Sequence, residues 1–385
     1  MNLFTSEIEQ LNFDTEKEKK YNSYLGRCSN KCIIQDCENK AIYSHVISEK
    51  RYLMNISRGG HLIGIVSKRK KNQKYLSIES IGIQKASGFS GFCKNHDSEY
   101  YNIDCNGLNT YYDLLFQFKR VLYKHLYYHN YYKEYENDFA TIWLTKFVNL
   151  ISKKLNICIN KLTHLYKEEA SRKFKKYHEI ENYIKVEIEN INMLIDSISK
   201  SKKLDDESVL SHEDICFYII RKRWAIKLPC ALDAGYYYYL NDVLLAFHFC
   251  ILPENDRTEI LMILPKNDPA DINKKIVKQM EDDLGILNFC EALLMSSENW
   301  YISPEVFDTF SDKKIKFMKD DLYFINERMF YNEYDMSIFD SIRHDIIKLY
   351  DKSVVQNERN KLINFPKRAS SEDRMTKFKE KIFST

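Results

Sequence analysis

The sequence contains few of the residues that form tight turns, with 10 glycines and 6 prolines among 385 residues. Because these residues supply most short turns, their scarcity favours long helices with few tight connections. Hydrophobic residues make up 44% of the chain and charged residues 29%, a balance typical of globular proteins with a buried core. The length exceeds one ordinary domain, so we expect two or three.

Two kinds of targeting signal are also missing. The N-terminal residues MNLFTSEIEQ lack the basic-then-apolar pattern of a secretory signal. The most apolar stretch, VLLAFHFCIL, is well short of the ~20 residues that span a bilayer. We therefore expect a cytoplasmic protein without a membrane partner, whose ten cysteines are reduced and available for metal binding rather than for disulfides.

A strong net charge and the common catalytic motifs are absent as well. The formal net charge is only +3, so any affinity for nucleic acid must come from local basic patches. The sequence contains no GxxxxGK(S/T), GxGxxG, GxSxG or HExxH motif. These absences argue against a P-loop NTPase, a dinucleotide-binding enzyme, an α/β-hydrolase and a zincin protease.

The chain divides into three segments that differ in composition and in expected secondary structure. We expect an α+β protein with a cysteine-rich N-terminal domain (1–106), a long helical middle (107–205), and a C-terminal domain of mixed antiparallel sheet and helices (206–385) with a basic tail. The alternating runs HLIGIVSK and KYLSIESIGI predict two strands or a hairpin. Four apolar runs between residues 215 and 265 predict antiparallel strands, and Ser303 before Pro304 predicts a helix start.

The middle segment carries a heptad-like pattern within residues 162–200. Its apolar positions follow three-four spacing, interrupted once by Glu181: Phe174, Tyr177, Ile184, Ile188, Ile191, Ile195 and Ile198. Two arrangements fit this pattern, an antiparallel helical hairpin within one chain and a dimerising coiled coil. We favour the hairpin, because the preceding helix offers an apolar partner face, and keep a homodimer through this helix as the alternative.

Two close pairs of soft metal ligands lie far apart in the N-terminal segment, within CIIQDC and GFCKNHD. The pairs are Cys32 with Cys37, and Cys93 with His96. Two such pairs of thiolate and imidazole donors can bind one Zn²⁺ tetrahedrally, so we expect a structural zinc site. Cys28 is a rival first ligand, and a lone histidine, His45, lies between the pairs.

This arrangement resembles the HNH, or ββα-metal, endonuclease family, in its members with a structural zinc. In that pattern a cysteine pair precedes a strand that ends in histidine, usually within D-H-I, and a second pair opens a helix. Here YSHVI places His45 at the first histidine, and Asp97 falls where the last histidine would be. The resemblance covers roughly residues 28–100 and implies a treble-clef, ββα zinc domain.

The resemblance implies hydrolysis of phosphodiester bonds in nucleic acid, DNA in preference to RNA, in bacterial anti-phage defence or a mobile element. His45 would be the general base that activates water, and Asp97 would help to hold a catalytic Mg²⁺ or Mn²⁺. Three features depart from the family. Ser44 replaces the acidic residue before the first histidine, no middle asparagine is evident, and Asp97 replaces the last histidine.

A basic cluster in SKRKKNQK lies between the ligand pairs, within the predicted hairpin. It comprises Lys68, Arg69, Lys70, Lys71 and Lys74. Such a cluster can neutralise phosphates and give sequence-independent affinity for nucleic acid, although a solvated turn is the plainer interpretation. The alternative to a nuclease is a non-catalytic zinc protein that binds nucleic acid or a protein partner.

The remaining histidines and acidic residues suggest no second site. His212, His248 and His344 are isolated in the sequence, and we expect each to be an ordinary core or surface histidine rather than a ligand. The acidic residues of the predicted sheet do not assemble into a carboxylate–metal nuclease core. The sequence therefore places the candidate chemistry in the N-terminal segment.

Overall fold

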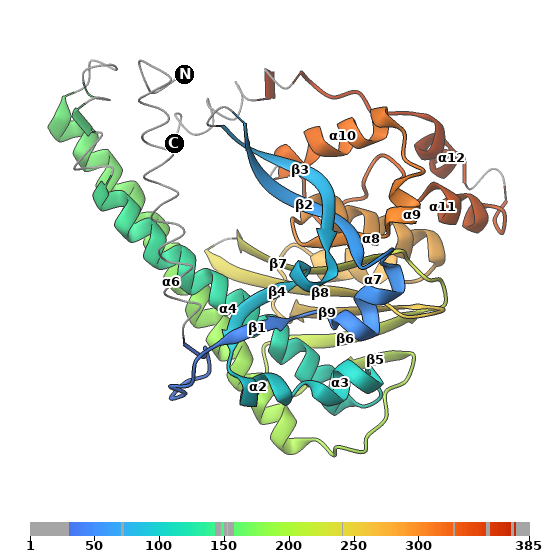
Figure 1. Cartoon of the computed structure of the whole chain (residues 1–385), viewed down its shortest axis with the longest axis horizontal. Helices are drawn as coiled ribbons and strands as arrows, with labels where there is room; N and C mark the ends of the chain where they lie inside the picture. Colours follow the sequence, from blue (N-terminus) through green and yellow to red (C-terminus); the bar gives the residue numbers. More distant parts are fainter. Residues whose placement is uncertain are drawn as a thin grey trace.

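The computed structural model of the chain combines helices with two antiparallel sheets (Figure 1). The α+β class expected from the sequence is therefore confirmed. The described residues are 31–70, 73–142, 148–149, 152, 158–240, 242–325, 328–351, 355–370 and 373–374. Cys28, the rival zinc ligand, lies outside them.

Eight strands form the large sheet in the order β3-β2-β10-β7-β8-β9-β6-β5, and all neighbouring strands are antiparallel. The strands are β2 (His61–Lys70), β3 (Gln73–Gly82), β5 (Glu207–Leu210), β6 (Phe217–Trp224), β7 (Cys230–Leu240), β8 (Val243–Pro253), β9 (Thr258–Pro265) and β10 (Trp300–Ile302). The predicted hairpin of the N-terminal segment is β2–β3. The four predicted apolar strands are β6 to β9.

The central strands are apolar along nearly their whole length because both faces of the sheet are buried. On β8, Phe247 and Phe249 belong to one hydrophobic core, whereas the alternate residues Cys250 and Leu252 belong to the other. Side chains of successive strand residues point to opposite faces, so one strand supplies both cores. Any polar residue on these strands is therefore placed in an apolar layer.

One face of the large sheet is covered by α4 (Tyr111–Ile142) and α6 (Ile159–Ser197), which run side by side (Figure 1). Thr110 forms a β-bridge with Lys203, and Lys133 forms an ion pair with Glu181 further along both helices. These pairings show that the two helices are antiparallel within one chain. Ile184, Ile188 and Ile191 are buried in the shared core.

The opposite face is covered by the C-terminal helices (Figure 1). They are α7 (Ile272–Gln279), α8 (Asp283–Ser296), α9 (Pro304–Phe307), α10 (Asp312–Tyr323), α11 (Asp340–Ile347) and α12 (Gln356–Ile363). Helix α8 is buried along nearly its whole length. Helix α9 begins at Pro304 after the cap residue Ser303, as the sequence predicts.

The small sheet pairs β1 (Ile42–His45) with β4 (Gly88–Phe92), and α2 (Lys94–Ser98) and α3 (Tyr101–Asn106) follow. Short helical turns at Glu49–Leu53, Met54–Ile56 and Ile83–Lys85 connect this sheet to the β2–β3 hairpin. The hairpin itself pairs with β10, so the large sheet includes strands from both ends of the chain. The division into three independent domains stays a prediction.

Candidate metal centre

Three thiols and one imidazole converge beside the small sheet. The Sγ atoms of Cys32 and Cys93 lie 3.3 and 3.4 Å from Nδ1 of His96, and Cys37 Sγ lies 3.8 Å from Cys93 Sγ. All four donor atoms lie within 4.8 Å of one another. A tetrahedral zinc with bonds of about 2.0–2.3 Å separates sulfur from its neighbouring donors by about 3.5–3.8 Å. The predicted ligands therefore form a Cys₃His cluster that can bind a metal such as zinc.

Local turns bring the members of each ligand pair together. The Cys37 N–H donates to the Ile34 carbonyl at 3.2 Å, which folds the first pair into a turn. Cys93 is the N-cap residue of α2, so His96 follows it within the first helical turn. The Cys93 N–H also donates to Cys32 Sγ at 3.4 Å, which connects the two pairs directly.

The thiols differ in how readily they ionise. Burial acts to raise the pKa of the Cys93 thiol, but the N–H groups of His96 and Asn95, with the neighbouring thiols, outweigh it and lower that pKa to about 7. Burial raises the pKa of Cys32 to about 11. Cys93 is thus more ready than Cys32 to bind as a thiolate at neutral pH, and a bound dication would favour the ionised form of both.

A carboxylate lies on the outer side of the histidine ligand. His96 Nε2 is 4.0 Å from Glu99 Oε1, while Nδ1 faces the thiols. A carboxylate beside one ring nitrogen favours a proton there and leaves the other nitrogen free to bind a metal. Glu99 was not among the residues predicted from the sequence, although its position three residues after His96 indicates this role.

His45 ends β1, and 21% of its side chain is exposed. Its Nε2 lies 3.2 Å from the Gln84 carbonyl oxygen and 3.8 Å from a carboxylate oxygen of Glu49. A carbonyl can only accept a hydrogen bond, so Nε2 carries the proton and Nδ1 keeps its lone pair. The imidazole can therefore accept a proton from water at Nδ1.

Asp97 lies on α2, where its N–H donates to the Cys93 carbonyl at 2.9 Å and its carbonyl accepts from the Tyr100 N–H at 3.2 Å. In the part of the chain that the structure describes, no hydrogen bond or ion pair connects its carboxylate with His45. The carboxylate nearest to His45 in these contacts belongs to Glu49, which was not among the predicted site residues. A catalytic pair of His45 and Asp97 stays a prediction.

The backbone just beyond β1 is held by Ser87, which adopts the left-handed conformation at φ 58°. Its Oγ accepts a hydrogen bond from the Ile47 N–H at 3.0 Å, and its N–H donates to the Tyr301 hydroxyl at 2.6 Å. The Ser87 hydroxyl also donates to Asp233 at 3.4 Å, and Asp233 is paired with Lys124. This network connects the end of β1 with β7, β10 and α4.

The predicted nucleic-acid-binding cluster lies at the end of the β2–β3 hairpin. Lys68, Arg69 and Lys70 are on β2 and Lys74 is on β3, with Arg69 opposite Lys74 in the strand register. Lys71 and the side chains of the other four lie outside the described residues. Their contact with nucleic acid stays a prediction.

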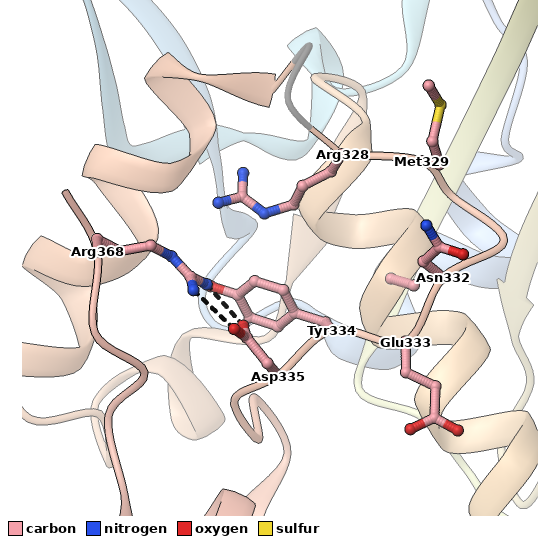
Figure 2. A pocket seen from close by; sticks show the side chains of 8 residues that line it. Arg328, Met329, Asn332, Glu333, Tyr334, Asp335 and Arg368 are labelled. Atoms are coloured by element: carbon pink, nitrogen blue, oxygen red, sulfur yellow. Dashed lines mark hydrogen bonds and ion pairs between the residues drawn. The ribbon is translucent and has the colours of Figure 1, made fainter. Parts of the chain in front are cut away.

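The C-terminal half contains a polar cavity of about 290 Å³ (Figure 2). Its lining residues are Ala292, Arg328, Met329, Asn332, Glu333, Tyr334, Asp335 and Arg368. Arg328 is paired with the buried Asp321, and Arg368 is paired with both Asp321 and Asp335. Because these cations are already neutralised by carboxylates, we assign no ligand to this cavity.

Comparison with known proteins identifies no relative: no family model, no curated protein and no solved structure matches the chain. Among the helices that the structure describes, none is both long enough and apolar enough to cross a membrane. The class that the geometry defines is an α+β protein with a Cys₃His cluster able to bind a metal.

Proposed function

We propose that this protein is a metal-dependent endonuclease of the HNH, or ββα-metal, type. The observation that carries the proposal is the pairing of β1 with β4 directly before α2, with His45 opposite Gly88 and the Cys₃His cluster at the strand–helix junction. A strand, a strand and a helix in this order are what the resemblance to HNH nucleases implies. A treble-clef arrangement of the zinc site belongs to the same proposal.

The zinc in this proposal has a structural role. Four protein donors complete a tetrahedral zinc and leave no position for a water molecule, which is typical of structural sites. Cys37 and Cys93 are 56 residues apart in the sequence, so a bound ion closes a long loop and fixes β1 relative to α2. The chemistry must then come from side chains beside the zinc.

His45 is the general base of the proposed reaction. Its Nδ1 accepts a proton from the water that attacks the phosphodiester, while the Nε2–H donated to the Gln84 carbonyl holds the ring in place. A bound Mg²⁺ or Mn²⁺ would stabilise the negative charge that develops on the phosphate. Glu49 and Asp97 are the carboxylates that we propose to hold that ion.

The proposed substrate is nucleic acid, with DNA favoured over RNA. The cluster Lys68, Arg69, Lys70, Lys71 and Lys74 would contact the phosphate backbone, and such contacts weaken as salt is raised. A role in bacterial anti-phage defence or in a mobile element rests only on the resemblance to HNH nucleases, whereas a cytoplasmic location rests on the sequence composition.

A non-catalytic zinc protein that binds nucleic acid or a protein partner is the second candidate. Ser44 favours it, because this residue stands where the family has an acidic side chain, and it is buried rather than open to a metal. In this case His45 and Asp97 only stabilise the fold.

The deciding experiment measures cleavage of supercoiled plasmid and of single-stranded RNA by the purified protein with Mg²⁺ or Mn²⁺. His45→Ala should reduce the rate by about 10²–10⁴-fold, the contribution of a general base, without loss of zinc. The matched control is His61→Ala, because His61 is an exposed histidine on β2, in the other sheet.

Two outcomes would overturn the proposal that this protein is a nuclease. Cleavage that survives His45→Ala would show that His45 is not the base. Absence of cleavage with every divalent ion tested, from a folded protein that contains zinc, would favour the non-catalytic alternative.

A further inference from the structure

A second group of metal-ligating side chains lies between the helix pair and the large sheet, and the proposed nuclease does not use it. His125 is on α4, Glu187 is on α6 and His248 is on β8. All three residues are buried. The Nδ1 atoms of the two histidines are 2.9 Å apart, and their ring centres are separated by 5.0 Å.

The position of Glu187 determines which nitrogen of His248 carries the proton. Its carboxylate oxygen lies 2.9 Å from His248 Nε2. A carboxylate accepts hydrogen bonds, so Nε2 carries a proton and Nδ1 is the nitrogen that faces His125. A carboxylate behind an imidazole is the usual partner of a histidine that binds a metal.

The Nδ1 atom of His125 faces the Nδ1 atom of His248. Burial, together with the neighbouring His248 and Lys124, holds the pKa of His125 well below its usual range. The Tyr237 hydroxyl lies 3.4 Å from this Nδ1 atom and adds an oxygen donor beside it. Neutral imidazoles are the form in which histidines bind metals.

We propose that His125 and His248 bind a second metal ion, a first-row transition dication, through their Nδ1 atoms. With metal–nitrogen bonds of about 2.0–2.1 Å, the 2.9 Å separation corresponds to an angle of about 90° at the metal. Imidazole donors suit Zn²⁺, Cu²⁺, Ni²⁺ and iron. Water and the Tyr237 hydroxyl are the remaining ligands, and Glu187 orients His248.

Two further observations distinguish this group from ordinary core histidines. Glu187 Oε1 and His129 Nδ1 are buried without a hydrogen-bond partner, a costly arrangement that a metal-bound water would relieve. Moreover, a Cβ atom at Gly235 would lie 2.5 Å from Cε1 of His125. The His125 imidazole can pack against the backbone of β7 only because residue 235 is a glycine.

The test is the number of metal ions per chain after dialysis to saturation with Zn²⁺ or Co²⁺, measured by elemental analysis. The wild-type chain should hold two ions, one in each site. His125→Gln and His248→Gln should each hold one, and His212→Gln, at an exposed histidine, should still hold two.

Cobalt distinguishes the two sites, because only the Cys₃His cluster produces thiolate-to-cobalt charge-transfer bands. His125→Gln should lose one Co²⁺ and retain these bands, whereas Cys37→Ser should lose the bands and retain one Co²⁺. A wild-type chain that shows the bands but holds a single ion would overturn the proposal, and so would a folded Cys37→Ser protein that holds none. The wild-type count needs no variant to fold, and none of these results depends on cleavage activity.

Discussion

Lys124 and Asp233 form a bidentate ion pair in the interior, with Nζ 2.6 and 2.8 Å from the two carboxylate oxygens. Only 2% of the lysine side chain and none of the aspartate side chain is exposed. The pair joins α4 to β7, and Ser87 connects it to Ile47, two residues beyond the strand that His45 ends. Because both charges are withdrawn from water, each depends on the other for compensation.

Loss of one partner of this pair should strongly destabilise the protein. Asp233→Ala leaves the Lys124 ammonium buried without a counter-ion, and we expect the free energy of unfolding to fall by about 3–5 kcal/mol. Urea denaturation measures this change. The double variant Lys124→Met with Asp233→Leu should recover most of the loss, since it removes both charges. A single variant as stable as the wild type would contradict the role assigned to the pair.

Ser87 should be more sensitive to alanine than to glycine. Both substitutions remove the hydroxyl that accepts from the Ile47 N–H, which should cost about 1–3 kcal/mol. Glycine in addition tolerates φ 58° without strain, so Ser87→Gly should unfold at a higher temperature than Ser87→Ala. Thermal denaturation of the two variants side by side tests this order, and the reverse order would refute it.

Removal of a zinc ligand should both release the metal and destabilise the N-terminal end. We expect Cys37→Ala and Cys93→Ala to lose the tightly bound zinc and to unfold at a lower temperature, because binding energy at a structural site is folding energy. Elemental analysis and thermal denaturation check these effects. Cys105→Ala, at an exposed cysteine outside the cluster, is the control and should retain full zinc content.

Stability should fall as the pH is lowered from about 6.5 towards 4. Burial lowers the pKa of His129 to about 4, whereas an unfolded chain has the ordinary value near 6.5. Between these values the unfolded state binds the additional proton, so the contribution of this residue is present above pH 6.5 and is lost in acid. It amounts to at most about 3 kcal/mol.

Urea denaturation at pH 7 and pH 4 measures this loss. The variant His129→Leu cannot be protonated and should therefore show a weaker dependence on pH. Because the pKa of His125 is also lowered, some dependence should remain in that variant. Equal losses in the wild type and in His129→Leu would rule out the assignment to His129.

The metal cluster could be predicted from the sequence because short spacings carry most of its geometry. Cys32 and Cys37 form one turn, and Cys93 and His96 lie within the first turn of a helix. Strands β6 to β9 were predictable for a related reason, since each is a single apolar run between turn residues. In both cases the information lies within about ten neighbouring residues.

The buried histidines could not be predicted, because their positions depend on packing between distant elements. His248 is 61 residues from Glu187 and 123 residues from His125, and no local pattern relates the three. Strand β10 is a similar case. Its three residues are too few to show strand alternation, yet they join the N-terminal hairpin to the rest of the sheet.

Strand β10 connects the N-terminal β2–β3 hairpin to the C-terminal strands of the large sheet. Tyr301 pairs with Gly64 on one side and with Ala231 on the other, and Ile302 likewise pairs with both β2 and β7, so two residues connect these strands. The Tyr301 hydroxyl also accepts a hydrogen bond from the Ser87 N–H. The Ser87 carbonyl in turn accepts one from the Val46 N–H, directly after the strand that His45 ends. A substitution that displaced Tyr301 would therefore disturb the pairing of β2 with β10 and the hydrogen bond to Ser87 at the same time.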